Sequence, residues 1–199
     1  MICKPAIRRV AQVGDWIVGL GSARSPIGDV SGHVVYAMEV TRTMSMQEYD
    51  TFCRSSLRGK IPKWSSRDHR RRVGDCIYDY SRGPRPIIRP SVHGEQNRKT
   101  DLSGRKALLS EHFYYFGDRP RELPEELAAI VHQTQGHKSV ANEKYAPMFV
   151  GWIEGLGVEP NRRRGKPQMQ ADIVGGEACA AACSARARKE DHRDTVRDC

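Results

Sequence analysis

Four short motifs carry the residues of this chain that could bind or act on a small ligand. They are Gly21-Ser22, Gly74-Asp75-Cys76-Ile77-Tyr78, Phe113-Tyr114-Tyr115-Phe116-Gly117 and Gly136-His137-Lys138-Ser139. Together they offer a carboxylate, several tyrosine rings, and a glycine turn followed by a lysine. A carboxylate can accept hydrogen bonds from a base edge, an aromatic ring can stack on a base, and a basic turn can hold a phosphate. The combination points to recognition of a nucleotide.

The second and third motifs could contact a base. Asp75 follows a glycine at a predicted strand entry, where its carboxylate could meet a base edge or, as the alternative, cap a turn. Tyr78 and Tyr115 could each stack on a base, which is worth ~1–3 kcal/mol per base in single-strand binders. Because strand side chains alternate, Tyr114 and Tyr115 point to opposite faces, and we expect one face to be core. One tyrosine of that pair is then open to a ligand.

The fourth motif is the best candidate for an anion site. A turn that contains Gly136 offers backbone N–H groups, Lys138 adds positive charge, and His137 and Ser139 can donate hydrogen bonds. The alternative is an ordinary polar connection between two elements. His93, in the loop Ser91-Val92-His93-Gly94, is a weaker binding candidate.

The segment from Leu57 to Val73 is the most basic part of the chain and is predicted to be a long exposed loop. A single acidic residue, Asp68, accompanies its seven cations, which are Arg58, Lys60, Lys63, Arg67, Arg70, Arg71 and Arg72. Trp64 lies among them. Such a segment could contact a phosphate backbone, with an affinity that falls as salt rises, or it could be merely solvated.

Enzymatic chemistry has little support in the motifs. The chain has no His-Glu-x-x-His, no phosphate-binding Gly-x-x-x-x-Gly-Lys-[Ser/Thr] and no nucleophile elbow. If the protein is an enzyme, Asp75 and His137 are the candidate acid and base. The six cysteines include no Cys-x-x-Cys, so we expect neither a zinc site nor a disulfide framework, and we expect no cofactor.

Hydrophobic and turn patterns predict the elements that must position these motifs. Two strand-like runs within residues 13–40 flank a turn-rich loop, and further strands are expected at 74–80, 106–109 and around the aromatic motif. Ser45 followed by Glu48 predicts a helix start, and helices are also expected over 123–133 and 145–156, the last ending at Gly157. Pro5 favours an extended start, and residues 81–105 are predicted to be loop.

Composition bounds the class of protein. The 199 residues include 33 Lys and Arg against 24 Asp and Glu. Residues 1–157 contain 24 of the basic and 17 of the acidic residues. The prediction is one domain over 1–157 and a disordered tail over 158–199, where large apolar residues almost vanish. Without a secretory signal or a long apolar run, we expect a cytoplasmic protein that does not meet a membrane.

The four motifs, taken in order, resemble the nucleotide modification associated domain 2 family. The likeness runs from about Cys3 to Leu156 and also includes Cys3-Lys4-Pro5, Ile7-Arg8-Arg9 and Gly14-Asp15-Trp16. It implies a companion of DNA or nucleotide modification systems in phages and bacteria. A looser likeness to the PUA, ASCH and EVE group implies an α+β fold with a small, mixed, PUA-like β-barrel and peripheral helices. Family members usually have a segment upstream of Cys3, so the resemblance also implies an N-terminally truncated chain.

The sequence thus predicts a non-enzymatic module that binds DNA, RNA or a nucleotide and recognises a modified base. Base contacts are expected from Asp75, Tyr78 and Tyr115, a phosphate at His137-Lys138-Ser139, and backbone contacts from the segment 58–72. The alternatives are an enzyme that acts on a modified nucleotide and a truncated, non-functional fragment.

Overall fold

The computed structural model describes residues 4–131, 137 and 139–167, and the chain divides into two compact units. Of the described residues, unit 1 contains 4–11 and 42–109, and unit 2 contains 12–41, 110–131, 137 and 139–167. Each unit is therefore built from segments that are far apart in sequence. The single domain over 1–157 stays a prediction.

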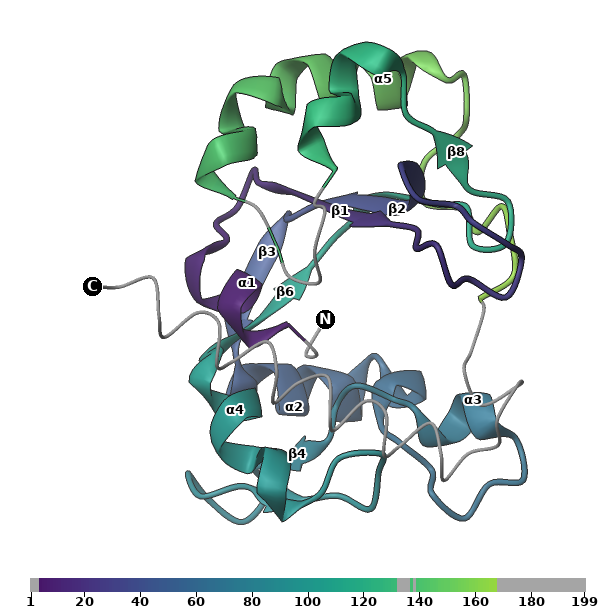
Figure 1. Ribbon diagram of the computed structural model, residues 1–199. Helices are drawn as coiled ribbons and strands as arrows, with labels where there is room; N and C mark the ends of the chain where they lie inside the picture. Colours follow the sequence, from purple (N-terminus) through teal and green to yellow (C-terminus); the bar gives the residue numbers. More distant parts are fainter. Residues whose placement is uncertain (1–3, 132–136, 138, 168–199) are drawn as a thin grey trace. The chain divides into compact units, whose positions relative to one another are not determined.

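Unit 1 combines short helices with two small antiparallel sheets (Figure 1). Its helices are α1 (Pro5–Val10), α2 (Met46–Ser55), α3 (His69–Arg72) and α4 (Arg98–Ser103), with 3-10 helices η1 (Arg58–Lys60) and η2 (Glu95–Asn97). Its strands are β3 (Arg42–Ser45), β4 (Tyr78–Asp79), β5 (Ile87–Ile88) and β6 (Lys106–Leu109). Strand β3 pairs with β6, and β4 pairs with β5.

Helix α2 begins as the sequence predicts. The Ser45 side chain accepts a hydrogen bond from the Glu48 backbone N–H at 3.2 Å, and the Glu48 carboxylate accepts one from the Ser45 N–H at 2.7 Å. Met46, Tyr49 and Cys53 follow at helical spacing and are buried in one hydrophobic cluster. The capping box therefore fixes where the helix starts, and the apolar face fixes how it packs in unit 1.

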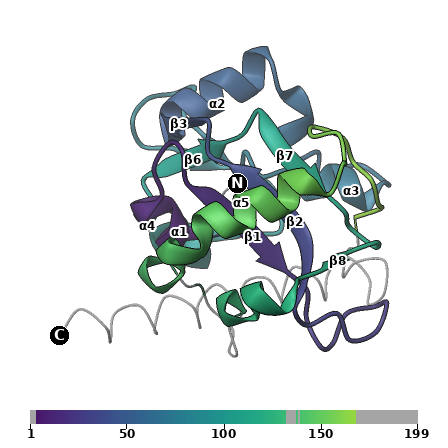
Figure 2. The same ribbon diagram turned by 90° about the horizontal axis from the view of Figure 1, so that it is seen from above.

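Unit 2 is an antiparallel sheet with one longer helix across it (Figure 2). Its elements are β1 (Trp16–Leu20), β2 (His33–Glu39), β7 (His112–Tyr115), β8 (Arg121–Glu122), η3 (Glu125–Ile130), η4 (Val140–Tyr145) and α5 (Ala146–Gly155). The order is β1-β2-β7, with β8 pairing to the other end of β2. The strand–loop–strand unit predicted within 13–40 is confirmed, and its two strands, β1 and β2, pair antiparallel.

The core of unit 2 lies between this sheet and α5. Phe149 and Ile153 of the helix pack with Tyr114 and Phe116, which are 4% and 1% exposed. Tyr115, on the opposite face of β7, is only half-buried. The predicted alternation, in which one face of the aromatic motif is core, is confirmed. Gly157 has a φ of +62°, a left-handed conformation that favours glycine and ends the helical segment.

Four local predictions differ from the structure. The start of the chain is helical, because a proline is tolerated in the first turn of α1, where its missing N–H leaves no bond unmade. Residues 81–105, predicted to be loop, hold β5, η2 and α4. The predicted helix at 123–133 is a 3-10 segment over Glu125–Ile130, and the predicted loop at 57–73 contains η1 and α3.

The mixed α+β class is confirmed. The described strands form several small antiparallel sheets, and no closed barrel is seen among them, so the PUA-like barrel stays a prediction. None of the helices described here is long and apolar enough to cross a membrane.

The described chain continues to pack past the predicted boundary at Gly157. The Arg164 N–H donates to the Tyr115 carbonyl at 2.8 Å, and the Lys166 N–H donates to the Asp118 carboxylate at 2.7 Å. Residues up to 167 thus belong to unit 2, and the rest of the predicted tail, 168–199, lies outside the described residues.

Candidate nucleic-acid interface

A pocket of about 500 Å³ in unit 1 is lined mainly by cationic side chains. We call it the basic pocket, and it is lined by Arg54, Arg58, Ile61, Pro62, Lys63 and Arg71. Four of the six residues are cationic and none is acidic. Two apolar residues complete the wall. Such a lining favours an anion with an adjoining apolar part over a neutral or cationic ligand.

The four cations come from α2, η1, the segment around Lys63 and α3, which hydrogen bonds tie together. The Arg58 Nε donates to the Arg54 carbonyl at 3.1 Å, which joins η1 to the end of α2. The Arg71 guanidinium donates to the Gly59 carbonyl at 2.7 Å, and the Lys63 N–H donates to the Arg71 carbonyl at 2.7 Å. These bonds fix α3 and the segment around Lys63 against η1, so the guanidinium groups share one pocket.

Gly74 allows the chain to return closely behind the pocket wall. A Cβ at this position would overlap the backbone of Lys60, Ile61 and Pro62. The Cys76 N–H donates to the Lys60 carbonyl at 2.9 Å, which keeps the two segments together. The glycine of the second predicted motif therefore serves close backbone packing next to the basic pocket.

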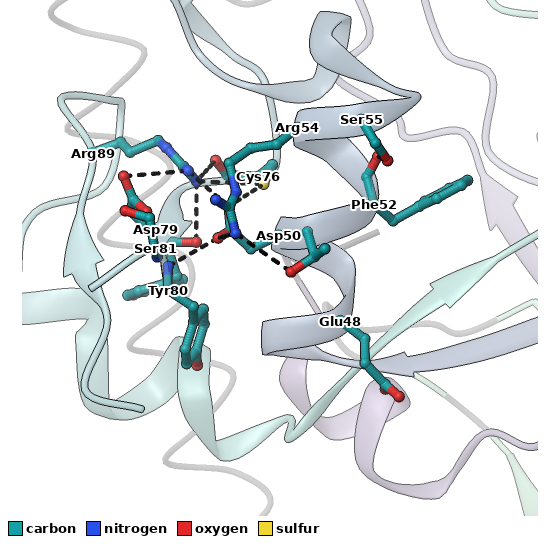
Figure 3. Close-up of polar contacts among 12 residues, drawn as sticks. Glu48, Asp50, Phe52, Arg54, Ser55, Cys76, Asp79, Tyr80, Ser81 and Arg89 are labelled. Carbon is teal, nitrogen blue, oxygen red and sulfur yellow. Dashed lines mark hydrogen bonds and ion pairs between the residues drawn. The ribbon is translucent and has the colours of Figure 1, made fainter. Parts of the chain in front are cut away.

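Asp50, which is fully buried, holds Arg54, one of the residues that line the pocket (Figure 3). Its carboxylate lies 2.7 Å from the Arg89 guanidinium and 3.3 Å from that of Arg54, and it accepts the Tyr80 N–H at 2.9 Å. A buried charge is tolerated only when it is paired and hydrogen-bonded, and these contacts supply both. Arg54 is thus fixed at the pocket by an acid that does not line it.

Arg89 extends this network from Asp50 to Cys76 and Asp79, as Figure 3 shows. It donates to the carbonyls of Cys76 and Tyr78 at 3.0 Å each and lies 3.4 Å from the Asp79 carboxylate. A hydrogen bond from Ser81, more than the Arg89 charge, lowers the pKa of Asp79. The network holds β4 and α2 together.

Asp75, Tyr78 and His93, three of the predicted binding residues, are engaged inside unit 1. The Tyr49 hydroxyl donates to Asp75 at 2.6 Å, and burial together with the Asp75 charge raises the pKa of Tyr49. The Tyr78 hydroxyl donates to Asp101 at 2.8 Å, and burial raises its pKa. His93 Nδ1 lies 2.6 Å from the same Asp101 carboxylate. Tyr78 is 1% exposed, so its ring packs in the core of unit 1 in this structure.

The predicted backbone-binding cations separate into two groups. Arg58, Lys63 and Arg71 line the basic pocket. The others do not line it; they are Lys60, Arg67, Arg70 and Arg72. Sequence reasoning missed Arg54, Asp50 and Arg89. The i,i+4 spacing of Asp50 and Arg54 on one helix was a usable signal for that pair.

The predicted binding residues of unit 2 have local partners of their own. The Gly21 N–H donates to the His33 carbonyl at 2.8 Å, and the Ser22 hydroxyl accepts from the Arg24 N–H at 3.2 Å. Tyr115 is half-buried, and burial raises its pKa.

The last motif is described in part. Ser139 precedes η4, and its backbone carbonyl accepts the Asn142 N–H at 2.9 Å. Gly136 and Lys138 lie outside the described residues. His137 belongs to unit 2 and Asp75 to unit 1, and their acid–base pairing stays a prediction. In the part of the chain that the structure describes, no three His, Cys, Asp or Glu side chains group to hold a metal ion.

Comparison with known proteins gives one clear match. The model of a family described as nucleotide modification associated domain 2 matches residues 1–173, which extends past the predicted domain end at Gly157. No curated protein and no solved structure matches significantly. Because the family model covers most of the 199 residues, the chain belongs to the nucleotide modification associated domain 2 family.

Proposed function

We propose that this chain is a nucleic-acid-binding module and that unit 1 holds backbone phosphates in the basic pocket. The observation that carries the proposal is the convergence of Arg54, Arg58, Lys63 and Arg71 on one pocket without a carboxylate in its lining. The family's association with nucleotide modification supports a nucleic-acid or nucleotide ligand.

The hydrogen bonds of the pocket favour an anionic ligand. Arg58 and Arg71 donate to backbone carbonyls, which orient a guanidinium without neutralising its charge. A guanidinium held in this way still presents donors for a phosphate, with the planar geometry that suits paired hydrogen bonds.

The net charge of unit 1 as a whole also favours binding of an anionic ligand. Residues 4–11 and 42–109 contain 19 Lys and Arg against 7 Asp and Glu, a formal net charge of +12. Such a field raises the local concentration of a polyanion and speeds its association, with a strong dependence on salt. This term carries affinity and no sequence information.

A modified base is the proposed feature that distinguishes the cognate nucleic acid. The family's association with nucleotide modification supports this finer proposal. Recognition of a base must come from contacts other than the phosphate site, because phosphates are alike in modified and unmodified strands.

The test is a fluorescence-anisotropy titration of the full chain with labelled single- and double-stranded DNA and RNA, each with and without a modified base, at two salt concentrations. The variant is Arg58→Gln/Lys63→Gln/Arg71→Gln. The matched control, Arg24→Gln/Arg119→Gln/Lys144→Gln, removes the same charge from exposed positions of unit 2.

We expect the pocket variant to lose affinity and to lower the slope of log K against log salt by about 2 for single strands, or ~0.7 per lost phosphate contact. The control variant should keep most of the slope. Equal losses in the two variants, or no binding of the natural chain at low salt, would overturn the phosphate site. A preference for the modified oligonucleotide that persists at the higher salt is the result expected for base recognition, and equal affinity for both would refute it.

A further inference from the structure

Trp64 is an exposed aromatic residue directly beside the basic pocket. It follows Lys63, which lines the pocket, and consecutive Cα atoms are about 3.8 Å apart. The residue is 40% exposed, and Trp is a large side chain that usually buries most of its surface. Its position in a strongly basic segment calls for an explanation other than core packing.

The surrounding hydrogen bonds hold Trp64 and the pocket in one small substructure. The Lys63 N–H donates to the Arg71 carbonyl, so the next residues on the two segments, Trp64 and Arg72, are also neighbours. The Arg72 guanidinium lies 5.9 Å from the centre of a Trp64 ring, and its Nε donates to the Ser66 carbonyl at 2.6 Å. A cation at this distance from an indole ring is attracted to its face.

The arrangement places a phosphate-binding pair and an aromatic pair side by side. Lys63 and Arg71 belong to the basic pocket, and Trp64 with Arg72 forms the adjoining cation–π pair. A nucleotide has a matching arrangement: its phosphate and its base lie side by side because one sugar joins them. Aromatic side chains next to a basic groove are how non-specific single-strand binders hold successive bases.

We propose that Trp64 stacks on an unpaired base of a strand whose phosphate occupies the basic pocket. The ligand class is therefore a single strand, or an unpaired segment of a longer nucleic acid. Paired bases in a duplex are already stacked on their neighbours, and their faces are closed to an indole ring. This inference rests on the proposed phosphate site and deepens it.

The experiment measures the affinity of the full chain for a thymidine oligonucleotide and for a duplex of equal length, in Trp64→Ala and Trp64→Phe variants. We expect Trp64→Ala to weaken single-strand binding on the order of tenfold and to change duplex binding less than twofold. Trp64→Phe, which keeps an aromatic ring, should retain most of the single-strand affinity and also guards against a folding defect.

Tryptophan fluorescence gives a second readout. The chain has three tryptophans, of which Trp16 and Trp152 lie in unit 2. Stacking should quench the emission of Trp64 when the oligonucleotide is added. The quenching should disappear in Trp64→Phe and persist in the control variant Trp152→Phe.

Two results overturn the inference in different ways. If the pocket variant Arg58→Gln/Lys63→Gln/Arg71→Gln loses binding but Trp64→Ala binds single strands as the natural chain does, the phosphate site stands and the stacking role is refuted. If the natural chain shows no salt-dependent binding to either oligonucleotide, both the phosphate site and the stacking role fail.

Discussion

The two units of the chain are stabilised by different means. Unit 1 has 19 basic and 7 acidic residues, while residues 12–41 and 110–167 of unit 2 have 9 and 11. Unit 1 buries charges: Asp50 and Arg8 are fully buried, and Arg8 donates to the Lys106 carbonyl at 2.9 Å. A unit with this excess of positive charge repels itself, and buried carboxylates that bind arginines from inside oppose that repulsion.

Unit 2 relies on apolar and aromatic packing. Trp16 stacks against Tyr114 with ring centres 6.3 Å apart, and Phe149 meets it edge-on at 6.2 Å. Such contacts depend little on salt or pH. The excess of positive charge is therefore confined to unit 1, the unit for which the phosphate site is proposed.

Asp50→Asn is expected to have the largest effect on stability, and it tests whether buried charges stabilise unit 1 more than unit 2. The substitution leaves Arg89, whose side chain is 12% exposed, without its closest carboxylate partner and should destabilise unit 1 by about 3–5 kcal/mol. Because two units need not unfold together, the measurement is hydrogen exchange resolved by peptide.

Peptides from α2 and β4 should exchange faster, while those from β2 and β7 should change little. The control is Asp29→Asn, at an exposed carboxylate in a turn of unit 2. Equal acceleration in both units would contradict the view that the charge network stabilises unit 1 in particular.

A slightly smaller effect is expected in unit 2 from Ile153→Ala. Ile153 is fully buried between α5 and the sheet, so its truncation leaves a cavity and should cost about 2–5 kcal/mol. The loss should appear in peptides from β1, β2 and β7 and should be the same at low and high salt. Met148→Ala, on the same helix but 51% exposed, is the control and should be nearly neutral. A strong salt dependence of the stability lost in Ile153→Ala would contradict the view that apolar packing stabilises unit 2.

Gly74→Ala tests whether the basic pocket depends on close packing behind it. The added Cβ would meet the backbone of Lys60, Ile61 and Pro62, which cannot move as a flexible side chain can, so we expect a loss of about 1–3 kcal/mol. Displacement of Ile61 and Pro62 should also weaken oligonucleotide binding.

Gly59→Ala is the matched control, because a Cβ there meets nothing closer than the Arg71 guanidinium at 3.8 Å. Thermal unfolding and anisotropy titrations of the two variants give the comparison. Gly74→Ala with unchanged affinity would show that the pocket tolerates a shifted wall.

The features that sequence reasoning predicted are those set by neighbours in the chain. The capping box joins Ser45 to Glu48, three residues away, and the alternation around Tyr114 follows from strand geometry. The basic segment is recognisable because its seven cations fall within 15 residues, 58–72, and three of them line the pocket.

The features that were missed depend on contacts between distant residues. Asp50 meets Arg89 across 39 positions, and Arg8 meets the Lys106 carbonyl across 98. No local pattern encodes such a pairing. Nor does one reveal that Asp75 meets Tyr49 and Tyr78 meets Asp101 inside unit 1, and the binding roles of Asp75 and Tyr78 stay predictions. The assembly of each unit from separate segments of the chain also depends on contacts between distant residues, so no local pattern predicts it.

The smallest expected effect concerns how the stability of unit 1 changes with pH, and it depends on Glu48 at the start of α2. The Ser45 backbone N–H donates to the Glu48 carboxylate, which lowers the pKa of Glu48 below its ordinary value of 4.5. A carboxyl group with a lowered folded-state pKa contributes stability that is present above its ordinary pKa and is lost as pH falls through the folded value. Glu48→Gln removes this ionisation, so unit 1 of the variant should lose less of its stability than the natural chain does on acidification below pH 4.5.

Glu154→Gln, at an exposed position of α5 in unit 2, is the control and should leave the acid response of unit 1 unchanged, because Glu154 belongs to the other unit. Urea unfolding followed by the emission of Trp64, in a Trp16→Phe/Trp152→Phe background, reports on unit 1 alone. An acid response of unit 1 that is the same with and without Glu48 would refute a contribution of the helix cap to its pH dependence.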